Sequence, residues 1–243
     1  MKIMSIQKEL MDWADKTAKG YVTIAKEDEE KASSFYTQSN LTKVLNSPEV
    51  MVLGINPGSE GSYNSQKENP NWGLNGKDMD GMHLIQGNYC KNEDGYPNWD
   101  DRDNWPYWKR LKAYFRDVES GNPLDNEEKY VVTNMSFFNS KKANQIPNLL
   151  LIKTIPYSLD LIRIIAPKHI IFLGGSGMLN KLKRVNRNNN LFDMSYELIK
   201  PKVYKGLFNN IPFLAVPHPS AHLYREERQT VVDCITAFMD KER

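Results

Sequence analysis

Two apolar stretches, far apart in the chain, each end in a rigid turn that carries one polar side chain. Residues 51–58 read MVLGINPG, and residues 213–220 read FLAVPHPS. Proline fixes φ and glycine permits positive φ, so each turn has a defined shape. Ligands in open α/β sheets bind beyond the carboxyl ends of the strands. We therefore expect Asn56 and His218 to face a single site.

The rest of the chain favours an α/β fold. Near-continuous apolar strands separated by helical segments indicate a mostly parallel sheet with helices on both faces. We expect one domain over residues 1–243, with an N-terminal helical extension at 1–47 and a long loop insertion at 59–104. The predicted strands are 50–55, 130–138, 169–173 and 212–216, with further candidates at 196–200 and 202–208. The predicted helices are 3–19 with Gly20 as its stop, 105–118, 148–166 with a break or kink at Pro156, a basic segment after 177, and 224–241.

Composition narrows the class of protein. No apolar run approaches the length of a membrane span, and the first residues lack the core of a signal peptide. The two cysteines, Cys90 and Cys234, suit a reducing compartment and favour neither a disulfide framework nor a cysteine-rich zinc site. We expect a cytoplasmic, monomeric enzyme that does not enter the membrane.

Charge is unevenly spread along the chain. The net charge is only +2, yet residues 59–105 hold four Lys/Arg and nine Asp/Glu, whereas residues 141–243 hold sixteen Lys/Arg and eight Asp/Glu. A basic C-terminal portion favours a polyanionic partner, although ordinary surface charge explains it equally well. Charge alone does not argue for nucleic acid.

The two turns resemble motifs of a known family. GINPG at residues 54–58 resembles the first motif of the uracil-DNA glycosylase superfamily, closest to the mismatch-specific and single-strand-selective branches, which carry Asn there. HPS at residues 218–220 resembles the second motif, and the order and wide separation also match. The resemblance covers roughly residues 50–228. It implies a three-layer α/β/α sandwich with a short parallel sheet; two ordinary strand-ending turns are the alternative.

The resemblance implies catalytic roles for the two polar turn residues. Asn56 would hold a water by its carbonyl oxygen, and His218 would donate a hydrogen bond to the base oxygen that gains charge as the glycosidic bond breaks. The alternatives are an Asn that bonds its own turn backbone and a His that satisfies a local backbone group. The remaining first-motif residues would line the base pocket: Gly54, Ile55, Pro57 and Gly58.

A base pocket also needs a reading group and an aromatic surface. Asn134 follows the apolar run 130–133, and its amide suits the adjacent O4 and N3–H of uracil; a strand-capping Asn is an equal alternative. Phe137 could wall the pocket. Trp72, with Tyr63 second, is the candidate for stacking on a flipped base, although such loop aromatics more often pack against the core.

Two further segments could contact a DNA backbone. The turn at 174–177, GGSG, runs from a strand into a helix, where free N–H groups of Gly175 and Ser176 could attract phosphate. A solvated helix face is equally possible for the basic residues that follow. They are Lys181, Lys183, Arg184 and Arg187.

The loop after the second motif is the third DNA-facing candidate. Ser220 belongs to the motif itself, and by resemblance Leu223 or Tyr224 would wedge into the duplex. His222 could contact phosphate, but a solvent-facing position is favoured. Ala221 stands where the family usually has proline, so the sequence departs from the family pattern in the loop that would form the wedge.

The sequence therefore predicts a monofunctional DNA glycosylase that removes uracil or a related damaged pyrimidine without metal or other cofactor. Nothing in the chain resembles the four-cysteine iron–sulfur pattern of some branches. A catalytically silent nucleic-acid-binding protein and a small-molecule nucleoside hydrolase, both on the same fold, remain the alternatives.

Overall fold

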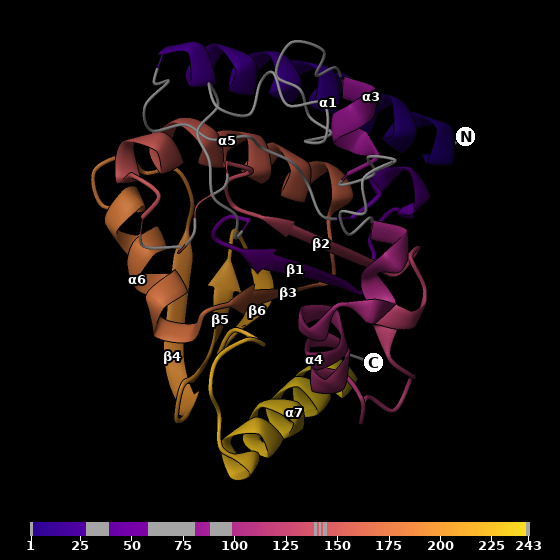
Figure 1. Ribbon diagram of the computed structural model, residues 1–243, viewed down its shortest axis with the longest axis vertical. Helices are drawn as coiled ribbons and strands as arrows, with labels where there is room; N and C mark the ends of the chain where they lie inside the picture. The colour runs from indigo at the N-terminus through magenta and orange to yellow at the C-terminus, as the bar shows by residue number, and fades with distance from the viewer. Residues whose placement is uncertain are drawn as a thin grey trace.

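The computed structural model describes residues 2–27, 39–57, 81–87, 99–138, 140, 142 and 145–241. Within this part of the chain, six strands form one sheet in the order β2-β1-β3-β6-β5-β4 (Figure 1). The first four in that order run parallel, β5 runs antiparallel to β6, and β4 runs antiparallel to β5. The strands are β1 Val50–Gly54, β2 Tyr130–Asn134, β3 His169–Leu173, β4 Met194–Lys200, β5 Val203–Phe208 and β6 Ile211–Val216. The predicted mostly parallel α/β sheet is confirmed.

Helices cover both faces of the sheet. In Figure 1, α5 and α6 lie on one face and α4 and α7 on the other, while α1 and α3 form an outer layer over α5. The arrangement is consistent with a three-layer α/β/α fold. The helices are α1 Lys2–Glu27, α3 Gly81–Ile85, α4 Pro106–Tyr114, α5 Asn148–Ile165, α6 Gly175–Asn186 and α7 Arg225–Asp240, with short 3-10 turns η1 Leu41–Lys43, η2 Trp99–Asn104 and η3 Pro123–Asp125. No described helix combines the length and apolar character that crossing a membrane requires.

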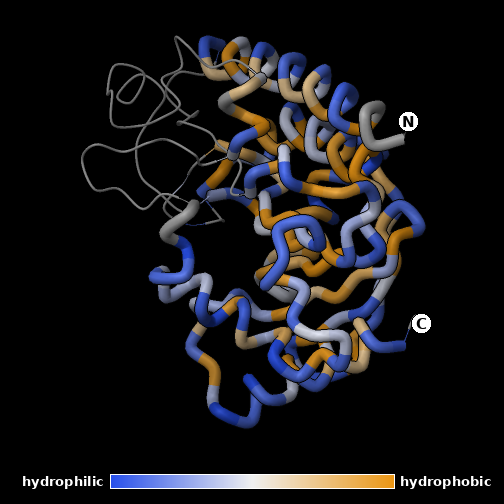
Figure 2. Tube along the Cα trace, turned by 90° about the vertical axis from the view of Figure 1, so that its right-hand side faces the viewer, coloured by the Kyte–Doolittle hydropathy of each residue, from blue (hydrophilic) through white to orange (hydrophobic). Residues whose placement is uncertain are grey.

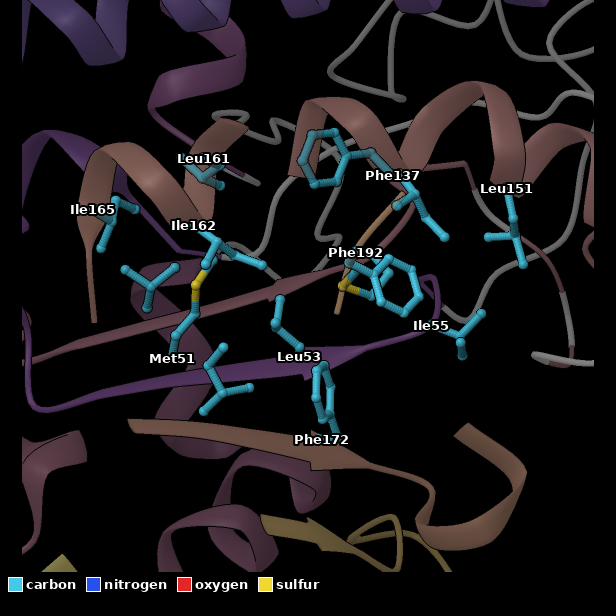
Figure 3. Packing of buried hydrophobic residues seen from close by; sticks show 14 of the residues in the cluster. Met51, Leu53, Ile55, Phe137, Leu151, Leu161, Ile162, Ile165, Phe172 and Phe192 are labelled. Carbon is cyan, nitrogen blue, oxygen red and sulfur yellow. The ribbon is translucent and has the colours of Figure 1, made fainter. Parts of the chain in front are cut away.

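Successive side chains of β1 point to opposite faces of the sheet, so the hydrophobic core has two parts. Met51 and Leu53 pack beneath α5, as Figure 3 shows, whereas Val50 and Val52 face α4 and α7. All four side chains are fully buried. Figure 2 shows the corresponding hydropathy, with apolar segments inside and polar segments outside. Burial of each such side chain contributes about 1.5–3 kcal/mol, so β1 is a strong anchor for the turn that follows it.

The prediction that Gly20 ends the first helix was wrong. Helix α1 continues to Glu27, and a Cβ at Gly20 would lie only 1.9 Å from the Tyr157 hydroxyl oxygen. Trp13 Nε1 donates to Tyr157 O at 2.8 Å from the same helix. The glycine therefore serves close packing of α1 against α5 rather than helix termination.

Other predicted limits of strands and helices also change. The strand predicted at 130–138 ends at Asn134, where its register partner Gly54 ends β1. Helix α4 ends at Tyr114 instead of 118, with a tight turn in which Phe115 N donates to Lys112 O. Helix α5 continues through Pro156, so the break predicted at this proline is absent.

Candidate functional site

The parallel strands bring most of the predicted site residues to one edge of the sheet. Gly54 pairs with Asn134, and Leu173 pairs with Val216, so β1, β2, β3 and β6 all end at the same edge. Asn56 follows β1 and His218 follows β6, with β3 between these two strands. The strand register thus supports the expectation from sequence that the two turns belong to one region.

Asn56 is held by its amide nitrogen. Nδ2 donates to Pro57 O at 2.9 Å and to Ser140 Oγ at 2.7 Å, which uses both amide hydrogens. The carbonyl oxygen Oδ1 is buried and has no hydrogen-bond partner among the described residues. The alternative interpretation, an Asn that bonds its own turn backbone, therefore accounts for Nδ2 but not for Oδ1. An acceptor left without a donor costs about 1–3 kcal/mol when buried.

Asn134 lies against Gly54 on the neighbouring strand. A Cβ at Gly54 would come within 2.5 Å of Asn134 Oδ1, so any side chain there would displace the amide. Asn134 is 3% exposed, and its Nδ2 has no hydrogen-bond partner in the described ranges. Buried amide donors are rarely left unpaired in folded proteins. Within the described residues, Asn134 Nδ2 is thus an unpaired donor at the end of β2, and Asn56 Oδ1 is an unpaired acceptor just beyond the end of the adjacent β1.

Residues after β2 run alongside the first motif. Met135 N donates to Gly54 O at 2.8 Å, Ser136 N to Ile55 O at 2.9 Å, and Ser140 N to Pro57 O at 3.1 Å. These main-chain bonds continue the pairing of β1 and β2 past the strand ends. They bring Ser140 beside Asn56 although the two are 84 residues apart in sequence.

His218 sits at the solvent-exposed rim of this edge with its ring held on two sides. Its Nδ1 accepts from Ser220 N at 3.2 Å, and the ring stacks on Tyr107 with centroids 5.5 Å apart and planes at 26°. Because Nδ1 accepts a hydrogen bond, the neutral ring carries its proton on Nε2. Partial burial against the protein lowers the pKa of His218 below its ordinary value. At neutral pH the ring is therefore a neutral Nε2–H donor.

The turn from β3 into α6 also reaches this edge. Gly174 N donates to Val216 O at 2.8 Å, directly before the second motif. Gly175 has φ 52°, and a Cβ there would meet Lys202 O at 3.3 Å, so glycine is needed both for conformation and for space. Gly175 is buried and Ser176 exposed.

The basic residues of α6 differ in their surroundings. Lys183, Arg184 and Arg187 are exposed, as expected for a helix face that could meet phosphate. Lys181 is half-buried, and its Nζ donates to Ile146 O at 2.8 Å. Burial, and then the nearby charge of Arg184, lower the pKa of Lys181. Lys181 therefore has a structural partner that competes with any phosphate contact.

The loop after the second motif leads into α7 with its aromatic residue outward. Tyr224 is 74% exposed and meets His222 edge-on at 5.9 Å between centroids. Leu223 is half-buried, and Ser220 and His222 are exposed. Glu227 accepts from Tyr224 N at 3.0 Å and pairs with Lys202 at 2.6 Å. These bonds fix the start of α7.

Some predicted site residues are not on a pocket surface or cannot be placed. Phe137 is fully buried and stacks on Tyr21 of α1 at 5.2 Å, so it packs in the core, and a role in walling a pocket stays a prediction. Phe137 N donates to the Tyr21 hydroxyl at 3.0 Å, which holds Phe137 on the α1 side of the core. Ile55 is also a core residue. Gly58 and Trp72, and the second aromatic candidate Tyr63, lie outside the described residues.

Sequence reasoning missed Ser140 and Tyr107. Ser140 reaches Asn56 only through the pairing of residues 135–140 with residues 54–57, and Tyr107 reaches His218 across 111 positions. A usable signal existed for Tyr107, because Pro106 favours a helix start and places this aromatic in its first turn. No comparable local signal marks Ser140.

Comparison with known proteins does not assign this chain to a family. No protein-family model matches the chain, and no curated protein matches it either. Among the described residues, no group of three or more His, Cys, Asp or Glu side chains could hold a metal ion.

A separate hollow of about 830 Å³ lies at the opposite, amino edge of the sheet. Its lining comes from the start of α1 and from the segments that lead into β1 and β2. Two of its acidic residues are already paired, Glu127 with Lys43 and Asp125 with Lys112, each at 2.6 Å. This hollow is distinct from the edge that carries Asn56, Asn134 and His218.

Proposed function

We propose that this protein hydrolyses the N-glycosidic bond of uracil, or of a related damaged pyrimidine, in DNA. One observation carries the proposal: among the described residues, the buried donor Asn134 Nδ2 and the buried acceptor Asn56 Oδ1, at the ends of adjacent strands, have no hydrogen-bond partner. Buried polar atoms of this kind need partners, and a base with its attacking water supplies both.

Asn134 would read the base. Uracil presents O4 and N3–H side by side, and an amide offers a donor and an acceptor in the same arrangement. Asn134 Nδ2 would donate to O4, and Oδ1 would accept from N3–H. Glycine at position 54 supports this role, because any side chain there would occupy the space beside Oδ1.

Asn56 would hold the attacking water. Its amide hydrogens are both engaged, so Oδ1 is the atom that can accept from a water molecule. An amide is not a strong base, but the sugar cation that forms as the bond breaks needs little activation of its nucleophile. Water positioned by Oδ1 would add to the anomeric carbon and lose its proton to solvent.

His218 would stabilise the departing base. The bond electrons move onto the pyrimidine, and its O2 gains negative charge. A neutral imidazole with its proton on Nε2 donates to that oxygen without first adding a positive charge. The Ser220 N–H bond to Nδ1 keeps the ring in this tautomer.

A direct test is incubation of the protein with an oligonucleotide that contains one uracil, followed by alkali. We expect strand cleavage at the uracil position, and none in the matched thymine oligonucleotide. Binding of uracil DNA without alkali-labile sites would instead support a catalytically silent nucleic-acid-binding protein. Release of base from free nucleosides alone would support a small-molecule hydrolase.

A further inference from the structure

The side-chain amide of Asn56 could in principle be turned either way, and its function depends on which end faces the site. Nδ2 lies 2.9 Å from Pro57 O, an atom that can only accept hydrogen bonds. A flipped amide would bring Oδ1 against this carbonyl oxygen and lose the bond. Pro57 O therefore fixes one of the two amide hydrogens.

The second amide hydrogen is fixed by Ser140. A serine hydroxyl can donate or accept, so its own partner decides its role. Ser140 Oγ donates to Lys142 O at 2.8 Å, which leaves only its lone pairs for Asn56 Nδ2 at 2.7 Å. Ser140 thus acts as an acceptor toward Asn56.

The position of Ser140 is itself restrained. Ser140 N donates to Pro57 O at 3.1 Å, and Gln145 N donates to Lys142 O at 2.9 Å. Gln145 Oε1 in turn accepts from Lys142 N at 2.9 Å. The hydroxyl and its acceptor are therefore held by backbone bonds that do not involve Asn56.

We propose that Ser140 is a positioning residue that locks the Asn56 amide with its carbonyl oxygen toward the reacting water. With both hydrogens engaged, Oδ1 is the polar atom of the Asn56 side chain that has no partner among the described residues. This inference rests on the proposed function for the role of the water. The orientation itself can be measured without any glycosylase activity.

The first test is the NMR signal of the Asn56 side-chain NH2 group in 15N-labelled full-length protein, assigned by its loss in Asn56→Asp. In the wild type we expect two separate proton resonances that exchange slowly with water. Ser140→Ala should shift one of them and speed its exchange, and Ser140→Thr, which keeps the hydroxyl, should restore both. Ser47→Ala is the matched control, because Ser47 Oγ donates to Ala166 O at 2.8 Å near the opposite edge of the sheet.

The second test is single-turnover release of uracil by the same variants. Ser140→Ala should lower the rate constant by up to about tenfold, the equivalent of one lost hydrogen bond, while the affinity for uracil DNA stays unchanged. Ser140→Thr should recover the rate. A structural defect would lower affinity and rate together and would not be rescued by threonine.

The outcomes separate this inference from the proposed function. If Ser140→Ala leaves the Asn56 NH2 resonances and their exchange unchanged, the positioning role is overturned whether or not the wild type is active. If these resonances respond as expected but the wild type releases no uracil, the orientation of Asn56 stands and the glycosylase proposal fails.

Discussion

The hydrogen-bonding roles of the site residues are set by backbone groups beside them. Pro57 O takes one amide hydrogen of Asn56, and Ser220 N occupies Nδ1 of His218. At Asn134, the absence of a side chain on Gly54 leaves the amide its place. Asn56 is left with an acceptor, Oδ1, and His218 with a donor, Nε2–H, while Asn134 keeps the donor Nδ2 beside its own Oδ1. Local main-chain geometry therefore determines the chemistry that each side chain can offer.

Stacking on Tyr107 should hold the His218 pKa down. We expect the imidazole proton signals to titrate with a midpoint below the ordinary value of 6.5, because partial burial disfavours the charged ring. Tyr107→Leu and Tyr107→Ala should both raise the midpoint, and Tyr107→Ala should raise it more than Tyr107→Leu. Tyr196→Leu, on β4 and away from the ring, is the control. A wild-type midpoint at or above 6.5 would contradict this account.

The sign of the pH effect follows from the direction of that shift. A histidine with a lowered folded pKa binds fewer protons folded than unfolded, so it removes stability as pH falls below 6.5 toward the folded pKa. Protonation also places a hydrogen on Nδ1 and breaks its bond with Ser220 N. His218→Gln should therefore lose less unfolding free energy over this acidic range than the wild type does in urea titrations.

Glycine at position 54 should matter more for function than for folding. The Cβ of Gly54→Ala would lie 2.5 Å from Asn134 Oδ1, the end of a side chain that can rotate away. We expect uracil release to be nearly abolished and the unfolding free energy to fall by no more than about 1–3 kcal/mol. Gly177→Ala is the control, since its Cβ would meet nothing within 4 Å. Full activity of Gly54→Ala would argue against a reading role for Asn134.

At the scale of elements, the sequence was most informative where side chains are buried on both faces. The runs at β1, β3 and β6 are apolar except for His169 at the start of β3, and the prediction of strands there was correct. Local signals failed at Gly20, where a helix–helix contact overrides the preference of glycine for helix ends. They also did not reveal that Phe137 stacks on Tyr21 of α1, because an aromatic beside a candidate site residue looks the same in sequence whether it packs inward or outward.

The residues of the candidate site also differ in whether the sequence could predict them. Asn56, Asn134 and His218 were identifiable because each follows an apolar run, and parallel pairing brings strand ends together. Ser140 and Tyr107 were not, because their contacts with Asn56 and His218 depend on how irregular segments fold back on the sheet edge. Residue spacing carries no information about such contacts.

The contact between α1 and α5 offers a test at the element scale. Gly20→Leu should lower the unfolding free energy by about 1–3 kcal/mol, because the added side chain would push against Tyr157. Gly177→Leu introduces the same side chain into a helix position with open space and should cost much less. Equal unfolding midpoints for the two variants in urea would show that α1 does not pack as closely as described.

For the whole molecule, the basic C-terminal portion should govern binding to DNA. Neutralising Lys183 and Arg184, both exposed, should reduce the slope of log affinity against log salt by about two, because each phosphate contact releases about one counterion. Neutralising Lys8 and Lys19, which are exposed on the outer helix α1, is the control and should leave the slope unchanged. Lys181→Gln should change it less than Lys183→Gln, since Lys181 already bonds Ile146 O. A slope unaffected by Lys183 and Arg184 would exclude this helix from the DNA path.

The central claim is that Asn56 and His218 act on one base at one edge of the sheet. It is tested most directly by the single-turnover rate of free uracil release, measured by mass spectrometry for the wild type, Asn56→Ala, His218→Ala and the double variant. We expect release by the wild type, a loss of about 10²–10³-fold in each single variant, and affinity for uracil DNA largely retained. The double variant should lose less than the product of the two single effects, because both residues serve the same transition state. Release by both single variants at the wild-type rate, or no release by the wild type, would contradict the account.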